Sequence, residues 1–193
     1  MRIPTHRWRA LVALLAALAV SALGPAGRAG DKKPDDKKPA VVLPKDPKAV
    51  VLTYDPGAGG FVRKGDAPYL RVQADGQVTV VSVFDGSKTE GKLTPKELDE
   101  LLRFVVQDKD FLAVTEAKIA DGITDAAGKG PFLAVSGAGT SAIVVTNDGK
   151  THGVSYRGAA SFLQAYPKVD PLARFVAVEK RLTELGATVA KGK

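Results

Sequence analysis

The clearest hydrophobic pattern in the chain is an amphipathic stretch over residues 93–108. Apolar side chains recur there at the spacing of one helix face, at Leu98, Leu101, Leu102, Val105 and Val106. Thr94 suits the N-cap, Pro95 the first helical position, and Glu97 completes a capping box. The stretch therefore predicts an amphipathic helix that buries its apolar face against a sheet.

A β-hairpin is predicted over residues 68–84, with its turn at Asp75-Gly76. Two registers fit this turn. A two-residue turn places Arg71 opposite Val80, which mixes polar and apolar side chains. A three-residue turn with left-handed Gly76 puts four apolar residues on one face, namely Leu70, Val72, Val78 and Val80. Because it separates apolar from polar side chains, the second register is favoured.

Similar patterns predict the other elements. Short apolar runs indicate strands at 50–54, 131–136, 141–146 and 151–156, and a turn at Asn147-Asp148-Gly149 joins the last two. Another short edge segment follows the turn at Asp85-Gly86. The polar, glycine-punctuated stretch 116–130 is expected to be a loop.

A second long helix is predicted over 170–186. Asp170 is its expected N-cap, Pro171 its first residue and Gly186 its C-cap, and the Lys-containing tail at 187–193 is expected to be flexible. A shorter helix is expected over 159–166. Because tight turns rather than helical crossovers join most strands, we expect an α+β fold, an antiparallel sheet of hairpins with two main helices on one face, forming a single domain over 49–186.

The first 30 residues have the pattern of a secretory signal peptide. Three arginines precede an Ala/Leu/Val run over 10–23, which is too short for the roughly 20 residues that span a bilayer. Residues 31–48 are rich in lysine, proline and aspartate, so we expect a disordered, solvated spacer. The sequence therefore predicts export to the periplasm or the extracellular space, with no membrane span after signal cleavage.

The net charge of +7 belongs to the two ends of the chain. Residues 49–190 contain 16 basic and 17 acidic side chains, so the predicted domain lacks the basic footprint that nucleic-acid binding needs. The absence of cysteine excludes disulfides and thiolate chemistry. A macromolecular partner is accordingly expected to be another exported protein.

The residues that could carry chemistry form no complete catalytic or metal-binding set. His152 could serve Ser141 as a general base, but no orienting partner is evident. The glycines of 122–130 miss the spacing of a phosphate-binding loop, and the acids Glu116, Asp121 and Asp125 miss that of an EF-hand. We therefore expect no catalytic residue, no metal and no cofactor.

A glycine-rich loop after the first strand is the leading candidate for a binding site. Gly57, Gly59 and Gly60 allow left-handed backbone and close approach of another chain, and Phe61 could present an aromatic anchor to a partner. The alternative is a wide turn in which Phe61 folds onto the core.

With these features in order, the chain resembles small bacterial domains of the emfourin-like kind. The resemblance rests on Gly59-Gly60-Phe61 after an early strand, the LTPKELDELL helix followed by Phe111, the TNDGKTHGV hairpin and the C-terminal Pro171-Leu172 helix. Emfourin-like proteins include an inhibitor of thermolysin-like metallopeptidases, so the resemblance implies a non-enzymatic, protein-binding role. Three hypotheses follow. The first is an exported binding domain, in one version a peptidase inhibitor, the second is an accessory protein of the cell envelope, and the third is a hydrolase that uses Ser141 and His152.

Overall fold

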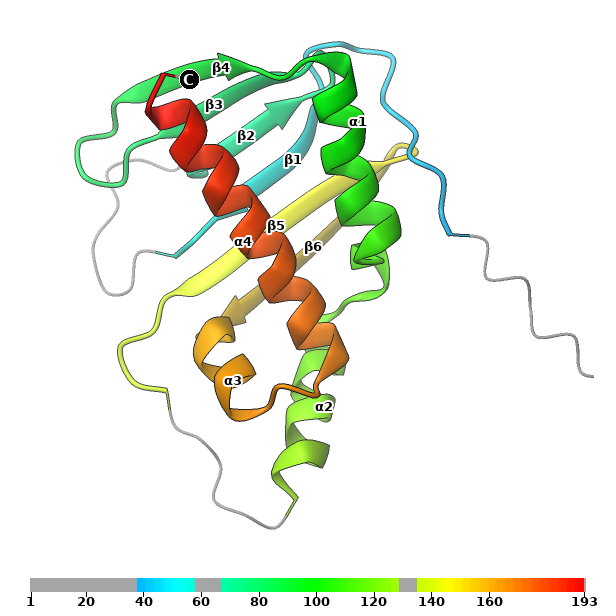
Figure 1. Ribbon diagram of the computed structural model, residues 1–193, viewed down its shortest axis with the longest axis vertical. Coiled ribbons are helices and arrows are strands. Elements are labelled where there is room, and N and C mark those ends of the chain that lie inside the picture. Colours follow the sequence, from blue (N-terminus) through cyan, green and yellow to red (C-terminus); the bar gives the residue numbers. More distant parts are fainter. Residues whose placement is uncertain (1–37, 58–66, 129–134, 193) are drawn as a thin grey trace, which may run out of the picture. The chain divides into compact units, whose positions relative to one another are not determined.

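The computed structural model describes residues 38–57, 67–128 and 135–192. Its elements are β1 (Val50–Asp55), β2 (Leu70–Gln73), β3 (Gln77–Val81), β4 (Lys88–Lys92), α1 (Pro95–Arg103), η1 (Phe104–Asp108), η2 (Phe111–Ala113), α2 (Glu116–Ala127), β5 (Thr140–Asn147), β6 (Lys150–Arg157), α3 (Ala159–Ala165) and α4 (Asp170–Ala190). The strands form one antiparallel sheet in the order β4-β3-β2-β1-β5-β6 (Figure 1). Four helices pack against it, which confirms the expected α+β class.

The alternation of buried and exposed residues along the strands gives the sheet one covered face and one open face. On the covered face, β1, β2, β3 and β5 bury their apolar side chains under α1 and α4, which both lie on the same side of the sheet in Figure 1. On the open face of β2, Arg71 is exposed and pairs with Thr79 of β3. The core therefore lies between the sheet and its helices.

The β2–β3 hairpin adopts the favoured register. Leu70 pairs with Val80 and Val72 with Val78, and Gly76 lies in the left-handed region at φ +85°. A Cβ at Gly76 would lie 2.5 Å from the Leu93 carbonyl oxygen, so only glycine fits. The three-residue turn is confirmed, together with its apolar face.

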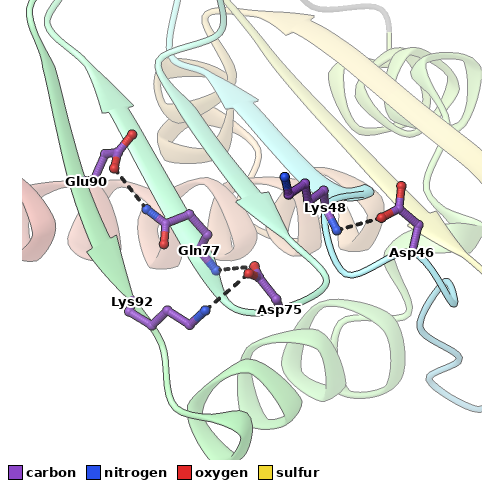
Figure 2. A network of polar contacts seen from close by, with 6 residues as sticks. All are labelled: Asp46, Lys48, Asp75, Gln77, Glu90 and Lys92. Carbon is purple, nitrogen blue, oxygen red and sulfur yellow. Dashed lines mark hydrogen bonds and ion pairs between the residues drawn. The ribbon is translucent and has the colours of Figure 1, made fainter.

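Polar side chains link this turn to the edge strand β4 (Figure 2). Asp75 accepts hydrogen bonds from the Gln77 backbone N–H at 2.9 Å and from Lys92 Nζ at 3.2 Å, and Gln77 Nε2 donates to Glu90 Oε2 at 3.2 Å. The hydrogen bonds of Asp75 lower the pKa of its carboxyl group, the bond from the Gln77 backbone most strongly. Lysines and a glutamate on β4 also discourage another chain from pairing with this edge.

The helix predicted over 93–108 forms along its whole length. Thr94 Oγ1 accepts from the Glu97 backbone N–H at 3.3 Å, and Glu97 accepts from the Thr94 backbone at 2.8 Å, which completes the capping box. The α-helical part ends at Arg103, and the last five residues continue as the π-helical turn η1. The five apolar residues of the predicted face are all buried.

One error of the sequence prediction is a missed helix. The expected loop at 116–130 contains the helix α2, which Thr115 caps by accepting from the Lys118 N–H. Ile119 and Ile123, one turn apart, are fully buried. Gly122 does not mark a turn, because it lies inside this helix, where a Cβ would come within 2.8 Å of Val169.

The long C-terminal helix α4 also differs from its prediction at both ends. Val169 occupies the N-cap position without a side-chain cap, and Asp170 is the first helical residue, paired with Arg174 at 2.7 Å. Gly186 does not end the helix, which continues to Ala190. Instead it is buried, and a Cβ there would lie 2.6 Å from the Tyr69 hydroxyl. Glycine at this position allows Tyr69 to pack closely against the helix. The helix continues past it and includes the first four residues of the tail that was expected at 187–193.

The second half of the expected spacer contacts the fold. The Asn147 side chain accepts from the Val42 backbone N–H at 2.8 Å and donates to the Ala40 carbonyl at 3.0 Å. Gln107 donates to the Pro39 carbonyl at 3.2 Å, and the Pro47 carbonyl accepts from the Asp75 N–H at 2.9 Å. Residues 38–48 form no helix or strand and are mostly exposed, and this part of the expected spacer is held to the domain through Pro39, Ala40, Val42 and Pro47.

The remaining elements follow the predictions with one exception. The β5–β6 turn has Asp148 at φ +51° and Gly149 at φ +67°, as expected for Asn-Asp-Gly in a hairpin, and the short helix α3 is present. Most of the strand predicted at 131–136 lies outside the described residues, and Val135 and Ser136 are not in a strand.

Candidate partner-binding site

Gly57 is the one member of the predicted glycine-rich site that the structure describes. It follows β1 at φ +67°, and its N–H donates to Asp55 Oδ1 at 3.2 Å. A Cβ at Gly57 would lie 2.2 Å from the Thr140 carbonyl oxygen, so no other residue fits here without movement of the backbone. Gly59, Gly60 and Phe61 lie outside the described residues, and the Phe61 anchor stays a prediction.

The β3–β4 turn presents the most exposed large apolar side chain of the described residues. Phe84 is 87% exposed. The turn beneath it is fixed by backbone hydrogen bonds from Ser82 to the Ser87 carbonyl at 2.8 Å and from Gly86 to the Ser82 carbonyl at 3.1 Å. Phe84 itself donates to Ser82 Oγ at 3.3 Å. The turn thus holds an aromatic ring in water on an ordered backbone.

Asp85 provides a further constraint on this turn. Its Oδ1 accepts from the Ser87 N–H at 3.0 Å and from the Ser87 hydroxyl at 2.8 Å. Hydrogen bonds from the side chain of Ser82 and from Ser87 lower the pKa of the Asp85 carboxyl group to about 2. The side chain is therefore ionised and can accept these bonds throughout the physiological pH range.

Sheet topology brings Gly57 and the Phe84 turn to the same end of the sheet. β1 ends where β2 begins, and β3 ends beside them, since the Val81 N–H donates to the Tyr69 carbonyl at 2.8 Å. Two strand spacings, or about 10 Å, separate β1 from β3. We call this end, where Gly57 and the turn 82–87 lie, the loop end of the sheet.

A partly buried polar cluster lies beside Gly57 at the loop end. Ser141, which is 6% exposed, donates a short hydrogen bond to Glu179 of α4, and its Oγ lies 3.2 Å from the Pro56 carbonyl oxygen. The Tyr54 hydroxyl lies 3.4 Å from Glu179 Oε1 and 3.1 Å from Thr183 Oγ1. Burial raises the pKa of Tyr54 well above its usual value, so its hydroxyl remains protonated.

A cavity of about 210 Å³ opens beside this cluster. Ser141 and Glu179 form part of its wall. The rest consists mostly of small residues from three connecting segments and α3, namely Pro56, Ala138, Gly139, Gly158, Ala159, Ala160 and Ser161. Neither the cluster nor the cavity corresponds to a local sequence motif, because Ser141 and Glu179 are 38 positions apart.

The structure does not bring Ser141 and His152 together. Ser141 pairs with Tyr156 across β5 and β6, whereas His152 pairs with Val145, four residues further along the strand. Four strand residues span about 13 Å. A serine–histidine hydrolase pair requires hydrogen-bond reach, which this separation does not allow.

His152 instead has structural partners. Its Nε2 lies 2.8 Å from the Val114 carbonyl oxygen, and its ring meets Phe111 edge-on at 5.8 Å between centroids. These contacts hold η2 against β6. The histidine is thus bound into the packing at the start of α2.

The acidic residues at 116–125 now belong to α2 and not to a loop. Glu116 accepts from the Ser155 backbone N–H at 3.0 Å and so covers part of the β6 edge. Asp121 and Asp125 are exposed on the helix. Within the described residues, no group of three or more His, Cys, Asp or Glu side chains could hold a metal ion.

Phe84 is the surface residue that the sequence analysis missed. The sequence places it at the end of an apolar strand, directly before Asp85-Gly86, and a strand-end phenylalanine there suggests packing on the core. The available signal was its position beside a tight turn, where side chains leave the sheet. Only the turn geometry shows that it points into water.

None of the helices that the structure describes is long and apolar enough to cross a membrane. Comparison of the chain with protein-family models, curated proteins and solved structures gives no match.

Proposed function

We propose that the protein is an exported, non-enzymatic protein-binding domain that contacts another exported protein through Phe84 and the loop end of the sheet. The observation that carries this proposal is the 87% exposure of Phe84 on an ordered turn. Full burial of a phenylalanine contributes about 1.5–3 kcal/mol, a gain that the described part of the domain does not use at this position.

The order of the turn favours a binding role for this ring. A side chain on a preformed turn loses little conformational freedom when a partner covers it, so more of the burial energy contributes to affinity. Phenylalanine is also enriched in the desolvated centres of protein interfaces. The predicted signal peptide at 1–30 supports export, and the separation of Ser141 from His152 supports a non-enzymatic role.

The position of residues 38–43 favours a second candidate, an accessory protein of the cell envelope. This segment binds Asn147 at the β5–β6 turn, which is the end of the sheet opposite the loop end. A tether that enters the domain there would direct Phe84 away from the surface that holds the tether. If the protein is an accessory protein of the cell envelope, it should fractionate with wall or membrane. The function as an exported protein-binding domain does not require this.

Photo-crosslinking in the native cells tests the proposal. A benzophenone amino acid replaces Phe84 in the full chain, and the matched control carries it at Val42, a 42% exposed apolar position at the opposite end. We expect a discrete crosslinked product with one exported protein from position 84 and not from position 42. Crosslinks of equal yield at both positions, or at neither in a folded protein, would overturn the proposal.

Titration against a thermolysin-like metallopeptidase tests the form of the proposal that the emfourin-like resemblance implies. Inhibition by the full chain that is weakened by Phe84→Ser supports a peptidase inhibitor. Absence of inhibition excludes the hypothesis that the domain is an inhibitor of these peptidases. The crosslinking result then decides whether the domain binds another protein.

A further inference from the structure

Glu179 presents a carboxylate to the cavity at the loop end, and none of the described residues places an opposite charge in contact with it. It is half-buried, and within the described part of the chain it forms no ion pair. The guanidinium of Arg157 at the end of β6 binds the Ala138 carbonyl oxygen at 3.1 Å instead. A partly desolvated charge of this kind gains from a cation that enters the cavity.

The neighbours of Glu179 orient its carboxylate group. The Ser141 hydroxyl donates to Oε1, and the Tyr54 hydroxyl lies 3.4 Å from the same oxygen. Both hydroxyls come from adjacent strands of the sheet, β1 and β5, so the group is held by the core and not by a loop. The second oxygen, Oε2, has no hydrogen bond within the described residues and remains available to a ligand.

The size of the cavity fits one side chain. Its volume of about 210 Å³ is below the roughly 300–1,000 Å³ of typical small-molecule sites. Its walls are formed largely by glycine and alanine, which leave room for a slender chain with a charged head. A guanidinium or ammonium group supplies several N–H donors and no acceptor, which matches the Glu179 carboxylate and the Pro56 carbonyl oxygen, 3.2 Å from Ser141 Oγ.

We propose that this cavity binds an arginine or lysine side chain of the partner protein, with Glu179 as its counter-ion. The proposal rests on the proposed function, because it assigns a second contact to the same partner at the loop end. Phe84 and the cavity would then form two separate contacts, one apolar and one ionic, on the same end of the sheet.

Titration of the isotope-labelled full chain with small cations tests the cavity without knowledge of the partner. The probes are methylguanidinium for arginine, n-butylammonium for lysine, and neutral methylurea as the control. We expect saturable NMR shifts of the Gly139, Gly158 and Ser161 amides with a cation and none with methylurea. Shifts of the same size with methylurea would overturn the proposal.

Two variants and one control locate the binding. Glu179→Gln keeps an oxygen that can accept from Ser141 and removes the charge, so we expect cation affinity to fall at least tenfold with unchanged amide shifts elsewhere. Ala160→Leu fills the cavity from α3 and should have the same effect. Glu184→Gln makes the same chemical change at an exposed position of α4 and should leave the affinity unchanged. Undiminished cation binding in both cavity variants would overturn the proposal.

The two proposals can fail separately. If Phe84 crosslinks to a partner and Glu179→Gln does not reduce capture of that partner, the ionic contact is wrong and the protein-binding function stands. If methylguanidinium or butylammonium binds at Glu179 while position 84 yields no crosslink, the cavity is a cation site and the function proposed for the domain is wrong.

Discussion

Replacement of Asn147 by alanine tests how the N-terminal segment is held on the domain. The side chain is 8% exposed and makes two hydrogen bonds to this segment, from the Val42 N–H at 2.8 Å and to the Ala40 carbonyl at 3.0 Å. Each such bond contributes a net 0.5–1.5 kcal/mol or so. We therefore expect Asn147→Ala to lower the free energy of unfolding by about 2 kcal/mol, which corresponds to a fall in Tm of roughly 4–8 °C for a domain of this size.

Hydrogen exchange distinguishes local release from general destabilisation. The Val42 amide should exchange much faster in Asn147→Ala, because its acceptor is gone and the segment can leave the surface. The matched control is Thr151→Ala in the same hairpin, where an exposed hydroxyl pair with Thr146 at 3.2 Å is lost. The control should change stability by no more than about 0.5 kcal/mol. Equal stability of the two variants, with Val42 still protected, would refute the attachment of this segment.

Three further predictions address the site and the corrected elements. Gly57→Ala should destabilise the domain by about 1–3 kcal/mol in chemical denaturation, because its Cβ would meet the Thr140 carbonyl oxygen in a left-handed backbone; an unchanged midpoint contradicts this. Ile119→Ala should cost about 2–5 kcal/mol if α2 is packed as described, and less than 1 kcal/mol if 116–130 were a surface loop. Asp85 has a folded pKa of about 2 against about 3.9 when unfolded, so its stabilising effect is present above pH 4 and is lost as the pH falls through 2. An NMR titration of the Ser87 amide should show that midpoint near 2, and a midpoint near 4 would contradict an ordered turn.

The elements that the sequence predicted correctly are those fixed by local chemistry. The side chains of Thr94 and Glu97 each accept a hydrogen bond from the other residue's backbone N–H, and Pro95 follows the cap. These three residues suffice to locate the start of α1. Asp75-Gly76 sets the hairpin register in the same way, since glycine alone tolerates φ +85° at this position. Both features can be recognised within a window of a few residues.

The elements that the sequence misassigned depend on distant partners. α2 has only Ile119 and Ile123 as large buried side chains, too few for a clear helical pattern. Gly122 suggested a loop, but it is a glycine because Val169 packs against it. Gly186 suggested a helix end for the same reason, although its packing partner is Tyr69, more than a hundred residues earlier. A single sequence contains no sign that a glycine is needed for close packing and not for a turn.

The candidate site shows the same division. The sequence analysis noted that Gly57 allows a left-handed backbone, and the structure places this residue at φ +67°. Phe84 was not anticipated, because an apolar residue at the end of a strand is ordinarily buried. The pairing of Ser141 with Glu179 requires the β1–β5 pairing and the path of α4, neither of which is encoded locally. The sequence alone therefore indicated the loop that begins at Gly57. It did not indicate that Phe84 is exposed or that Ser141 and Glu179 lie together at the same end of the sheet.

The most direct test of the central claim is the affinity of the crosslinked partner for Phe84→Ala, measured by calorimetry alongside the Tm of the free variant. We expect a loss of about 2 kcal/mol or more in binding, roughly a thirtyfold weaker Kd, with the Tm unchanged because the ring is exposed in the free domain. An unchanged Kd, or a Tm that falls with the affinity, would show that Phe84 is not the anchor of a binding surface.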